Sequence, residues 1–420
     1  MNGLLSVAMI VKNEERFLAE CLRSVASLAD DIIVVDTGST DQSVAIARSF
    51  GARVVRIEWP DDFSQARNVG LDLVNTPWVL VVDADEELLA DDVPALTQAI
   101  THPFADAYNL RIVSVMDRAE HISESYVLRL FRSHPQVRFE GKVHEQVFPA
   151  LRRLNMNVAA LNVRLLHKGY LGAVVEQRNK SARNRELLER QLREKPDDAY
   201  TLWQLAHTLL SIGELEEALS KIRQALKRTP VTHPLWVLEQ ITYARILESH
   251  GEHKRALRVL QEGQLSYPAY TDFYFLEGLI SLGSQNWERA ERAFRKCLEL
   301  GEAQGFLMTE TGVGSFKALF RLAQALSQQG KGKEALAYLL VTIQRYPSFR
   351  DAWQAIFNLM AGSTFDALLD TILLTVPLAT VVDTVSQWQN LNVDESRLLE
   401  AARQRLASTP QNSPTSAREG

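Results

Sequence analysis

The segment Trp78-Val79-Leu80-Val81-Val82-Asp83-Ala84-Asp85-Glu86 joins five apolar residues to a tetrad that carries three carboxylates. Pro77 precedes the run, and a short apolar run bounded in this way predicts a buried strand. The carboxylates then stand at the carboxyl edge of a sheet, where open α/β sheets bind ligands. Asp83 and Asp85 share one side of an extended backbone and could hold Mg²⁺ or Mn²⁺. The alternative is an acidic turn that caps a helix beginning near Asp91, and the tetrad alone leaves both open.

The composition bounds the class of protein. A chain of 420 residues can form two or three domains, and 46% hydrophobic with 23% charged residues is typical of a soluble globular protein. A net charge of −6 argues against nucleic-acid binding, and no apolar run approaches the roughly 20 residues of a membrane span. The N-terminus lacks the basic region of a signal peptide. Cys21 and Cys297 form no disulfide framework and are expected to be small buried residues on helix faces. These features predict a cytoplasmic protein.

The first part of the chain alternates between strand-like and helical segments. Phe17, Leu18, Cys21, Leu22 and Val25 form one apolar stripe at helical spacing, and a shorter helix around 44–48 has Thr40 or Asp41 as its cap. Short strand–helix–strand units predict right-handed crossovers and a mainly parallel sheet. Two later segments alternate like antiparallel strands. The predicted parallel strands are Leu5–Val11, Ile32–Val35, Arg53–Ile57 and Trp78–Val82, and the antiparallel ones are Ala107–Val115 and Ser125–Phe131.

From about residue 175 the strand signals disappear and an internal repeat begins. Small residues and a proline recur with the same spacing, and the step from Ala256 to Ala290 is 34 residues. Gly213 and Gly330 mark turns between paired helices. This pattern resembles the tetratricopeptide repeat, in which small residues let two helices pack closely. The recurring sets are Ala206, Ala218, Ala225, Pro230; Ala244, Ala256, Gly263, Pro268; Gly278, Ala290, Cys297; and Ala323, Ala335, Pro347.

These patterns predict an α/β domain followed by an all-α solenoid with a concave binding face. We assign residues 1–172 to the α/β domain and 173–195 to a helical linker. About four repeats and a degenerate one, which begins near Ser348 and uses Ala355 and Ala367, occupy 196–380. A C-terminal helix follows at 381–407, and the Pro/Ser-containing tail 408–420 is expected to be disordered. An insertion near 301–314 interrupts the repeat period.

Four polar segments end the four parallel strands and should meet at one edge of the sheet. Asp36 could accept hydrogen bonds from a ribose or a base, and Arg67 could pair with a phosphate through its planar guanidinium. Carboxylates in the last segment would hold the metal. Together the segments favour a site for a nucleoside diphosphate. They are Val11–Glu14, Val35–Asp41 with its Gly38-Ser39-Thr40 turn, Phe63–Gly70 and Asp83–Glu86.

Each of these residues also has an ordinary alternative role. Asp41 could be a helix cap and Gly38 could only supply a turn conformation. Arg67 and Asn68 could lie on an exposed helix face. Glu14 and its neighbour Glu15 would also stabilise a helix N-terminus through the macrodipole.

The segments Met9–Glu15, Val34–Asp41, Ala66–Gly70 and Asp83–Glu86 resemble the motifs of family 2 glycosyltransferases, over residues 4 to about 170. The resemblance implies a GT-A fold, a nucleotide-sugar donor, most often a UDP-sugar, inversion at the anomeric carbon, and Mg²⁺ or Mn²⁺ at an Asp-X-Asp motif. It makes Asp85 the main metal ligand, assisted by Asp83. It places the nucleotide sugar against Val11, Asn13, Glu14, Asp36, Ser39, Arg67, Asn68, Asp83 and Ala84. The appended repeats resemble those of bacterial members, including the type that glycosylates peptides such as glycocins.

Two further motifs supply candidates for catalysis and metal binding. The segment Phe139–Glu145 looks like an aromatic-X-Gly-X-X-His-Glu element of related bacterial transferases. Transfer requires a base for the acceptor proton, and we predict Glu145 first and His144 second. They could instead form a polar pair at a strand end, and no second His follows four positions later, which excludes a zincin-type protease. His167, after another apolar run, is a candidate metal or pyrophosphate ligand or a structural residue.

Three functions fit these features to different degrees. A metal-dependent glycosyltransferase acting on a peptide, protein or cell-envelope glycan explains all the motifs. An interaction scaffold with an inactive nucleotide-binding domain would not need the carboxylate pair. A nucleotidyltransferase usually carries a glycine-rich basic loop after its first strand, where this chain has Lys12-Asn13-Glu14-Glu15. The repeats suit a bound polypeptide and self-association, for example a homodimer, equally well.

Overall fold

The computed structural model describes residues 3–115, 122–168, 174–302, 311–388 and 390–408. The chain divides into two compact units, a first that runs to Phe273 and a second that begins at Tyr274. The first unit therefore contains the whole sheet together with the first helices of the helical region. The predicted tail lies outside the described residues, apart from Ser408, as does most of the predicted insertion between the third and fourth repeats.

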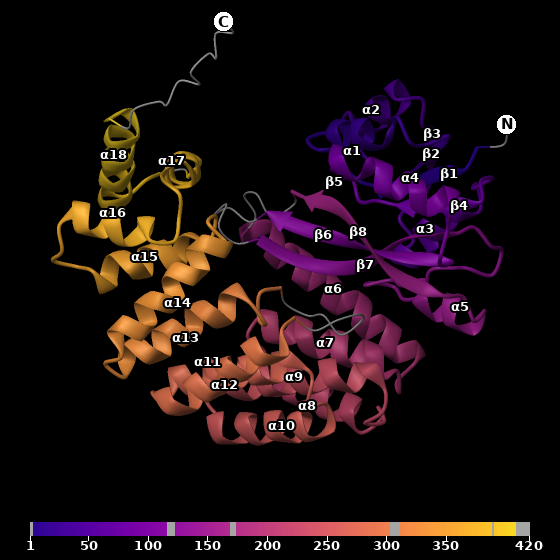
Figure 1. Ribbon diagram of the computed structural model, residues 1–420. Helices are drawn as coiled ribbons and strands as arrows, with labels where there is room; N and C mark the ends of the chain where they lie inside the picture. Colours follow the sequence, from indigo (N-terminus) through magenta and orange to yellow (C-terminus); the bar gives the residue numbers. More distant parts are fainter. Residues whose placement is uncertain (1–2, 116–121, 169–173, 303–310, 389, 409–420) are drawn as a thin grey trace, which may run out of the picture. The chain divides into compact units, whose positions relative to one another are not determined.

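An eight-stranded mixed sheet organises the N-terminal part of the first unit (Figure 1). The strand order is β3-β2-β1-β4-β7-β6-β8-β5. The pairs β1–β2, β2–β3 and β1–β4 are parallel and β6–β7 is antiparallel, which confirms both sets of predicted strands. The strands are β1 Leu5–Val11, β2 Asp31–Asp36, β3 Arg53–Arg56, β4 Trp78–Val81, β5 Glu86–Leu88, β6 Ala107–Val115, β7 Ile122–Arg132 and β8 Val158–His167.

Helices cover both faces of this sheet. On β4, Trp78 and Leu80 enter one apolar core while Val79 and Val81 enter the other, so this strand is buried on both sides. Four residues of the predicted apolar stripe, Leu18, Cys21, Leu22 and Val25, are 0–1% exposed, whereas Phe17 is the N-cap of α1 and is half-buried. The N-cap of α2 is Gln42, although the Asp41 carboxylate beside it accepts a hydrogen bond from Ser43 N at 2.9 Å. The helices are α1 Leu18–Val25, α2 Ser43–Ser49, α3 Phe63–Leu71, the 3₁₀ turn η1 Ala90–Asp92, α4 Val93–Thr101 and α5 Phe148–Arg153.

Strand β5 is absent from the sequence prediction and bends the sheet. It begins at Glu86 and pairs antiparallel with β8, four steps from β4 in the strand order. In a flat sheet those four steps would span about 19 Å. The chain from Val81 to Glu86 can reach at most about 18 Å, and a turn shortens it further, because Glu86 N donates to Asp83 O at 3.0 Å. The sheet must therefore curl, which brings the Asp83–Asp85 segment close to the end of β8.

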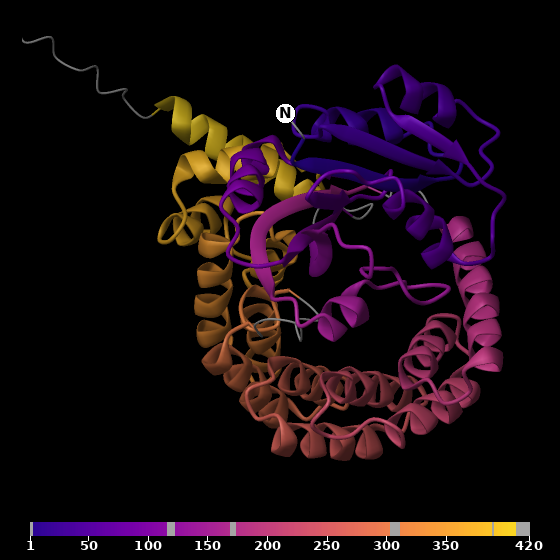
Figure 2. The ribbon, with the colours of Figure 1, turned by 90° about the vertical axis from the view of Figure 1, so that its right-hand side faces the viewer.

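From residue 174 every described element is a helix, and Figure 2 shows successive helices side by side within each unit. A long helix, α6 Val174–Glu194, is followed by the helices of the predicted repeats, and α15 and α16 occupy the place of the degenerate one. The helices after α6 are α7 Ala199–Ser211, α8 Leu215–Leu226, α9 Pro234–Ser249, α10 His253–Ser266, α11 Thr271–Gly283, α12 Trp287–Leu300, α13 Phe316–Gln328, α14 Gly332–Arg345, α15 Arg350–Leu359, α16 Phe365–Leu373, α17 Leu378–Ser386 and α18 Val393–Ser408.

The small residues of the repeat lie where paired helices touch. The repeated alanines Ala206, Ala218, Ala244 and Ala256 are all 0% exposed. A Cβ built on Gly278 of α11 would lie 2.5 Å from the Phe294 ring of α12, so a larger residue would force these helices apart. Gly213 and Gly330 have φ of +84° and +77° at the turns within their pairs, where a side chain would be strained. These contacts confirm the helical-repeat prediction.

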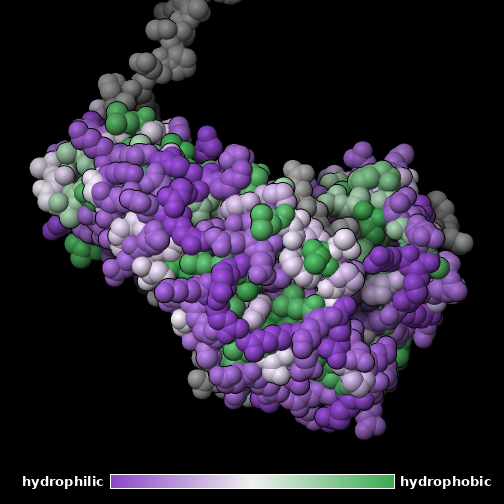
Figure 3. All heavy atoms as spheres, turned by 90° about the horizontal axis from the view of Figure 1, so that it is seen from below, coloured by the Kyte–Doolittle hydropathy of each residue, from purple (hydrophilic) through white to green (hydrophobic). Residues whose placement is uncertain are grey.

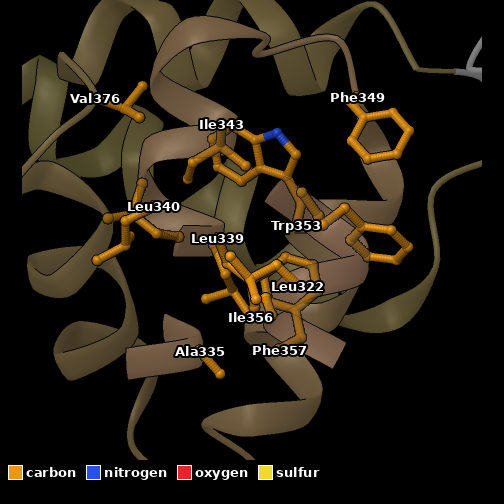
Figure 4. Packing of buried hydrophobic residues seen from close by; sticks show 14 of the residues in the cluster. Leu322, Ala335, Leu339, Leu340, Ile343, Phe349, Trp353, Ile356, Phe357 and Val376 are labelled. Carbon is orange, nitrogen blue, oxygen red and sulfur yellow. The ribbon is translucent and has the colours of Figure 1, made fainter. Parts of the chain in front are cut away.

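The second unit has its own apolar core. Figure 4 shows Trp353 of α15 among side chains from α13 and α14. Both cysteines are free and buried, in α1 and α12, as predicted. Large exposed apolar side chains are scattered over different elements, and the face drawn in Figure 3 is mostly hydrophilic. No single described helix is long and apolar enough to cross a bilayer, although α16 and α17, bent by 111°, pass that test as a pair.

Glu239 of α9 is a buried acid whose replacement should change the pH dependence of stability. It is 0% exposed, and its Oε1 accepts from Thr229 Oγ1 at 2.7 Å. Burial raises the pKa of Glu239 to about 7, against the Thr229 hydrogen bond that lowers it. The folded state therefore binds this proton more tightly than the unfolded state. Its contribution is complete below pH 4.5 and is lost as the pH rises through 7, a change of at most roughly 3 kcal/mol.

We expect Glu239→Gln, which keeps an acceptor for Thr229, to remove this loss. At pH 8 the variant should unfold at a higher temperature than the wild type, and at pH 5 the two midpoints should differ little. Thermal unfolding followed by circular dichroism at both pH values measures this. Equal midpoint differences at pH 5 and pH 8 would contradict the prediction.

Candidate active site

The loops that follow β1 and β2 are joined by hydrogen bonds at the carboxyl edge of the sheet. Asn13, with φ of +59°, donates from its backbone N to Ser39 Oγ at 3.0 Å and accepts from Thr40 N at 2.8 Å. Glu14 N donates to Ser43 Oγ at 2.8 Å, and the carbonyl of Val11 accepts from Thr37 N at 3.0 Å. The structure thus brings Val11, Asn13, Glu14 and Ser39 together, as the sequence predicts.

Asp36 ends β2 with a fully buried side chain. Its Oδ1 accepts from Ser39 N at 3.0 Å and its Oδ2 from Arg56 Nε at 2.8 Å. Burial alone would raise the pKa of Asp36, but these hydrogen bonds outweigh it and lower the pKa below the usual value. Arg56 is 60% exposed and holds the carboxylate from the solvent side. A nucleoside bound at Asp36 would therefore either share this carboxylate with Arg56 or displace the Arg56 side chain from it.

Asp85 and His167 meet across the junction between β4 and the end of β8. His167 Nε2 lies 3.1 Å from Asp85 Oδ2, and the two side chains are 22% and 21% exposed. The backbone fixes the pair, because Lys168 N donates to Asp85 O at 2.9 Å and Glu86 is opposite His167 in the β5–β8 ladder. Burial works against the imidazolium, but the hydrogen bond and charge of Asp85 prevail and raise the pKa of His167.

Asp83 faces two arginines instead of this pair. Arg67 Nη2 donates to its Oδ1 at 2.7 Å, and Arg129 Nη2 donates to its Oδ2 at 2.5 Å. The arginine side chains are only 8% and 11% exposed, whereas Asp83 is 35% exposed. Burial opposes ionisation, but Arg129 and Arg67 hold the pKa of Asp83 well below its usual value. Asp83 is thus the counter-ion of two buried cations, and the geometry favours Asp85 over Asp83 as the metal ligand.

Glu86 completes this buried charge network. It is 2% exposed, accepts from Arg129 Nη2 at 2.5 Å and accepts from Asp83 N at 2.9 Å. Burial raises the pKa of Glu86 to about 7, and the nearby Asp83 and Asp85 act in the same direction against Arg129. Ala84 turns its methyl group into the core beneath the tetrad. The carboxylates of the tetrad thus have different partners, because Asp85 faces His167 while Asp83 and Glu86 bind arginines.

Glu145 lies on the same network. Arg67 Nε donates to Glu145 Oε1 at 2.5 Å, so Arg67 joins Glu145 to Asp83. The Glu145 side chain is 11% exposed, and among the described residues its Oε2 makes no hydrogen bond. The structure therefore places the candidate base and the Asp-X-Asp segment on one arginine. Arg67 Nη1, although buried, has no hydrogen-bond partner in the described part of the chain.

His144 and Asn68 have different surroundings. His144 has φ of +54° and an exposed side chain, but partial desolvation of its ring by the surrounding residues lowers its pKa, with Glu145 opposing and His207 adding to the shift. Asn68 directs both ends of its amide to the backbone of Phe139, donating to O at 3.0 Å and accepting from N at 2.9 Å. Through these two hydrogen bonds the Asn68 side chain pairs with the backbone of the Phe139–Glu145 loop, as the backbone of a neighbouring strand would. This geometry favours a structural role for Asn68 over the predicted contact with the nucleotide sugar.

Sequence reasoning missed Arg129 and the burial of Glu86. Arg129 belongs to β7, one of the predicted antiparallel strands. Arg129 lies at a register shift of β7, because Asn109 pairs with Leu128 and Tyr108 with Leu130, and this irregularity breaks the alternation by which the sequence could have signalled a buried side chain.

We expect Arg129→Met to destabilise the first unit by about 3–5 kcal/mol, since it leaves Glu86 buried without its cation and Asp83 with only one. Thermal unfolding of the full chain measures this, and for a unit of this size the midpoint should fall by on the order of 10 °C. Arg132→Met on the same strand is the matched control. Arg132 is 40% exposed, pairs loosely with Asp106 at 3.5 Å and lies over the Trp78 ring at 4.8 Å, so its loss should cost about 1 kcal/mol, well below the cost of losing Arg129. Similar shifts for the two variants would refute the network.

Comparison with known proteins follows the division between sheet and helices. Residues 6–153 match the model of the Glycosyl transferase family 2. A TPR repeat-containing protein of Synechococcus elongatus is 36% identical over 53% of this chain and 56% of its own length. The SPbeta prophage-derived glycosyltransferase SunS of Bacillus subtilis is 27% identical over 53% of each chain. The chain thus spans about half the length of these curated relatives.

Among solved structures, S. aureus TarS 1-349 in complex with UDP-GlcNAc aligns with 59% of this chain and 89% of its own, at 15% identity and a TM-score of 0.38. MamA aligns with 43% of this chain and 91% of its own, at 19% identity and a TM-score of 0.32. The family match covers β1 to β4, the Asp83–Glu86 tetrad, Arg129 and Glu145. Residues 6–153, which carry nearly all of the site, are therefore a family 2 glycosyltransferase domain.

Proposed function

We propose that this chain is a metal-dependent, inverting glycosyltransferase that moves a sugar from a nucleoside-diphosphate donor, in the first instance a UDP-sugar, to a peptide, protein or cell-envelope glycan. One observation carries the proposal: Asp85 with His167, and Glu145 with Arg67 and Asp83, lie at the carboxyl edge of a family 2 domain. The candidate base Glu145 and the candidate cation ligand Asp85 are thus connected through Arg67 and the Asp83–Asp85 segment.

Asp85 and His167 fit a divalent cation as two of its ligands. A carboxylate oxygen suits Mg²⁺ and Mn²⁺, and Mg²⁺ is usually bound by one or two protein groups together with substrate phosphates and water. No group of three or more His, Cys, Asp or Glu side chains in the described ranges is arranged to hold a metal ion by itself. The remaining positions would thus fall to the donor's diphosphate and to water. When bound, the cation supplies charge neutralisation on the leaving diphosphate.

The remaining residues have roles that follow from their contacts. Glu145 Oε2 would accept the proton as the acceptor atom forms its bond to the anomeric carbon and the bond to the diphosphate oxygen breaks. Arg67 fixes the other carboxylate oxygen and so orients Oε2. A diphosphate or acceptor oxygen would satisfy Arg67 Nη1, since a buried donor without a partner costs about 1–3 kcal/mol. Asp36 and the Asn13–Ser39 loop pair would bind the nucleoside.

A groove in the second unit supports a polypeptide as the acceptor. It has a volume of about 630 Å³ and is lined by residues of α11 to α15 and the α11–α12 turn. Carboxamides dominate its polar lining, and each offers both a donor and an acceptor, as a peptide backbone requires. Arg321 is the one charged residue among the described residues of the lining. The carboxamides are Gln285, Gln324, Gln328 and Asn358.

A donor-hydrolysis screen tests the proposal. The full chain is incubated with UDP-, GDP- and dTDP-sugars in the presence of Mg²⁺ or Mn²⁺, and release of the nucleoside diphosphate is measured. We expect release from one donor class, dependent on the cation. No release from any donor, with nucleotide binding retained, would instead support a scaffold with an inactive nucleotide-binding domain.

A further inference from the structure

We propose that helices α6 and α7 are a working part of the active site and that Gln191 of α6 is a positioning residue for the loop that carries Glu145. The inference rests on the proposed function and deepens it, because it adds residues from outside the family 2 domain to the active site. It was not expected from the sequence, which assigned α6 to a linker and α7 to the first repeat.

The loop from Phe139 to Gln146 needs external support. Its own regular structure is a single bridge between Glu140 and Gln146. Gly141 has φ of +102° and His144 has φ of +54°, a left-handed conformation that is strained for a non-glycine residue. Such a conformation persists only where the surroundings hold it. Glu145 follows His144 directly, so the position of its carboxylate depends on those surroundings.

The sheet domain supports only one side of this loop. Arg67 and Asn68 of α3 hold Glu145 and Phe139, and Phe63 N donates to Lys142 O at 2.9 Å. The backbone N of Lys142 has its partner elsewhere. It donates to Gln191 Oε1 of α6 at 2.6 Å. The peptide groups of Lys142 are therefore clamped between the sheet domain on one side and the helical region on the other.

Gln191 is itself fixed by α7. Its Nε2 donates to Thr201 Oγ1 at 2.6 Å, and Thr201, 0% exposed, also bonds the capping residue Asp198 at the start of α7. A continuous chain of hydrogen bonds thus runs from the α7 cap through Thr201 and Gln191 to Lys142. Gln191 is hydrogen-bonded to Thr201 on one side and to Lys142 on the other. A substitution of Gln191 should therefore displace the loop without directly altering the donor site.

The two helices make further contacts with the same region. On α6, Arg190 Nη1 lies 2.7 Å from Asp61 Oδ2, and Arg183 lies over the Phe63 ring at 5.2 Å. On α7, Tyr200 Oη accepts from Gln146 Nε2 at 3.1 Å. Burial, with a contribution from the Glu145 charge, raises the pKa of Tyr200, and His207 acts on His144. Side chains of α7 therefore lie within electrostatic reach of the candidate base.

Gln191→Leu in the full chain tests the inference. It removes both hydrogen bonds of the carboxamide at similar volume. We expect the turnover of donor hydrolysis to fall about 10- to 100-fold with the KM for the donor unchanged, since a small displacement of a catalytic group has this effect. Gln191→Glu keeps an acceptor for Lys142 N and should recover much of the turnover. Gln224→Leu on α8 is the matched control and should resemble the wild type, because among the described residues the Gln224 amide donates only to Ser220 Oγ, at 3.3 Å.

Hydrogen exchange separates this inference from the proposed function. In Gln191→Leu the amide of Lys142 should exchange at least about tenfold faster than in the wild type, while amides of β1 and β4 keep their rates. Unchanged exchange at Lys142, or wild-type turnover in a folded Gln191→Leu variant, would overturn the inference. A wild-type chain that hydrolyses no donor would overturn the proposed function, and the exchange data would then show only whether α6 holds the loop.

Discussion

Asp85→Ala is expected to abolish sugar transfer, lowering turnover at least about a thousandfold, while the fold stays intact. A bound cation supplies several kcal/mol of charge stabilisation, and each 1.4 kcal/mol, approximately, corresponds to a factor of ten in rate. Asp85 faces His167 at 3.1 Å and carries none of the buried arginine contacts, so its loss should remove the cation and spare the charge network. Release of nucleoside diphosphate measures the rate, and electron paramagnetic resonance of free Mn²⁺ measures binding.

Asp91→Ala provides the matched control, because Asp91 is an exposed aspartate on η1 and its loss should alter neither readout. Excess chelator should stop the wild-type reaction, and added Mn²⁺ should restore it. Full turnover by Asp85→Ala together with unchanged Mn²⁺ binding would eliminate the metal site, and full turnover by the wild type in excess chelator would eliminate a metal-dependent reaction. Wild-type turnover together with weakened Mn²⁺ binding in the variant would separate the cation from the chemistry.

Glu145→Gln is expected to lower turnover about 10²- to 10⁴-fold, the usual contribution of a positioned general base. The amide oxygen can still accept the hydrogen bond from Arg67 Nε, so the loop should keep its position. An amide cannot take the acceptor proton, and donor binding should therefore change little. Initial rates and the dissociation constant of the nucleoside diphosphate, measured on the same preparation, test both parts.

The control is Glu140→Gln on the same loop, where the carboxylate is 41% exposed and pairs with Arg153. Its turnover should equal that of the wild type. His144→Ala tests the second candidate for the base. If His144→Ala loses turnover and Glu145→Gln does not, the base is His144 and Glu145 only fixes Arg67.

The sequence predicted the parts of the fold that rest on local periodicity. The four parallel strands, the stripe of α1 and the helix pairs follow from alternation, helical spacing and small residues, because each pattern is complete within one segment. Strand β5 was missed because it is three residues long and continues an acidic tetrad. Its pairing with β8 joins residues about 80 positions apart, and no local pattern encodes such a partner.

In the candidate site, too, local motifs identified residues but not their partners from distant parts of the chain. Asp85, His167, Glu145 and Arg67 were all singled out from motifs, and the structure brings them to one edge of the sheet. The partners were not predictable, since motif spacing cannot show that Arg129 turns Asp83 into a counter-ion or that Asn68 bonds the backbone of Phe139. Gln191 lies outside every motif, and only its hydrogen bond to Lys142 N reveals it.

The short connection between β4 and β5 also bears on how tightly a ligand can be held. Residues 82–85 lie between strands β4 and β5. The backbone carbonyls of Asp83 and Asp85 accept hydrogen bonds from Glu86 N and Lys168 N, respectively. Fixing a flexible backbone costs roughly 1–2 kcal/mol of conformational entropy per residue, a cost that folding has already met for these four residues. A cation and its diphosphate arriving at Asp85 would therefore lose mainly their own freedom of motion, and little of their binding energy would go into ordering the protein.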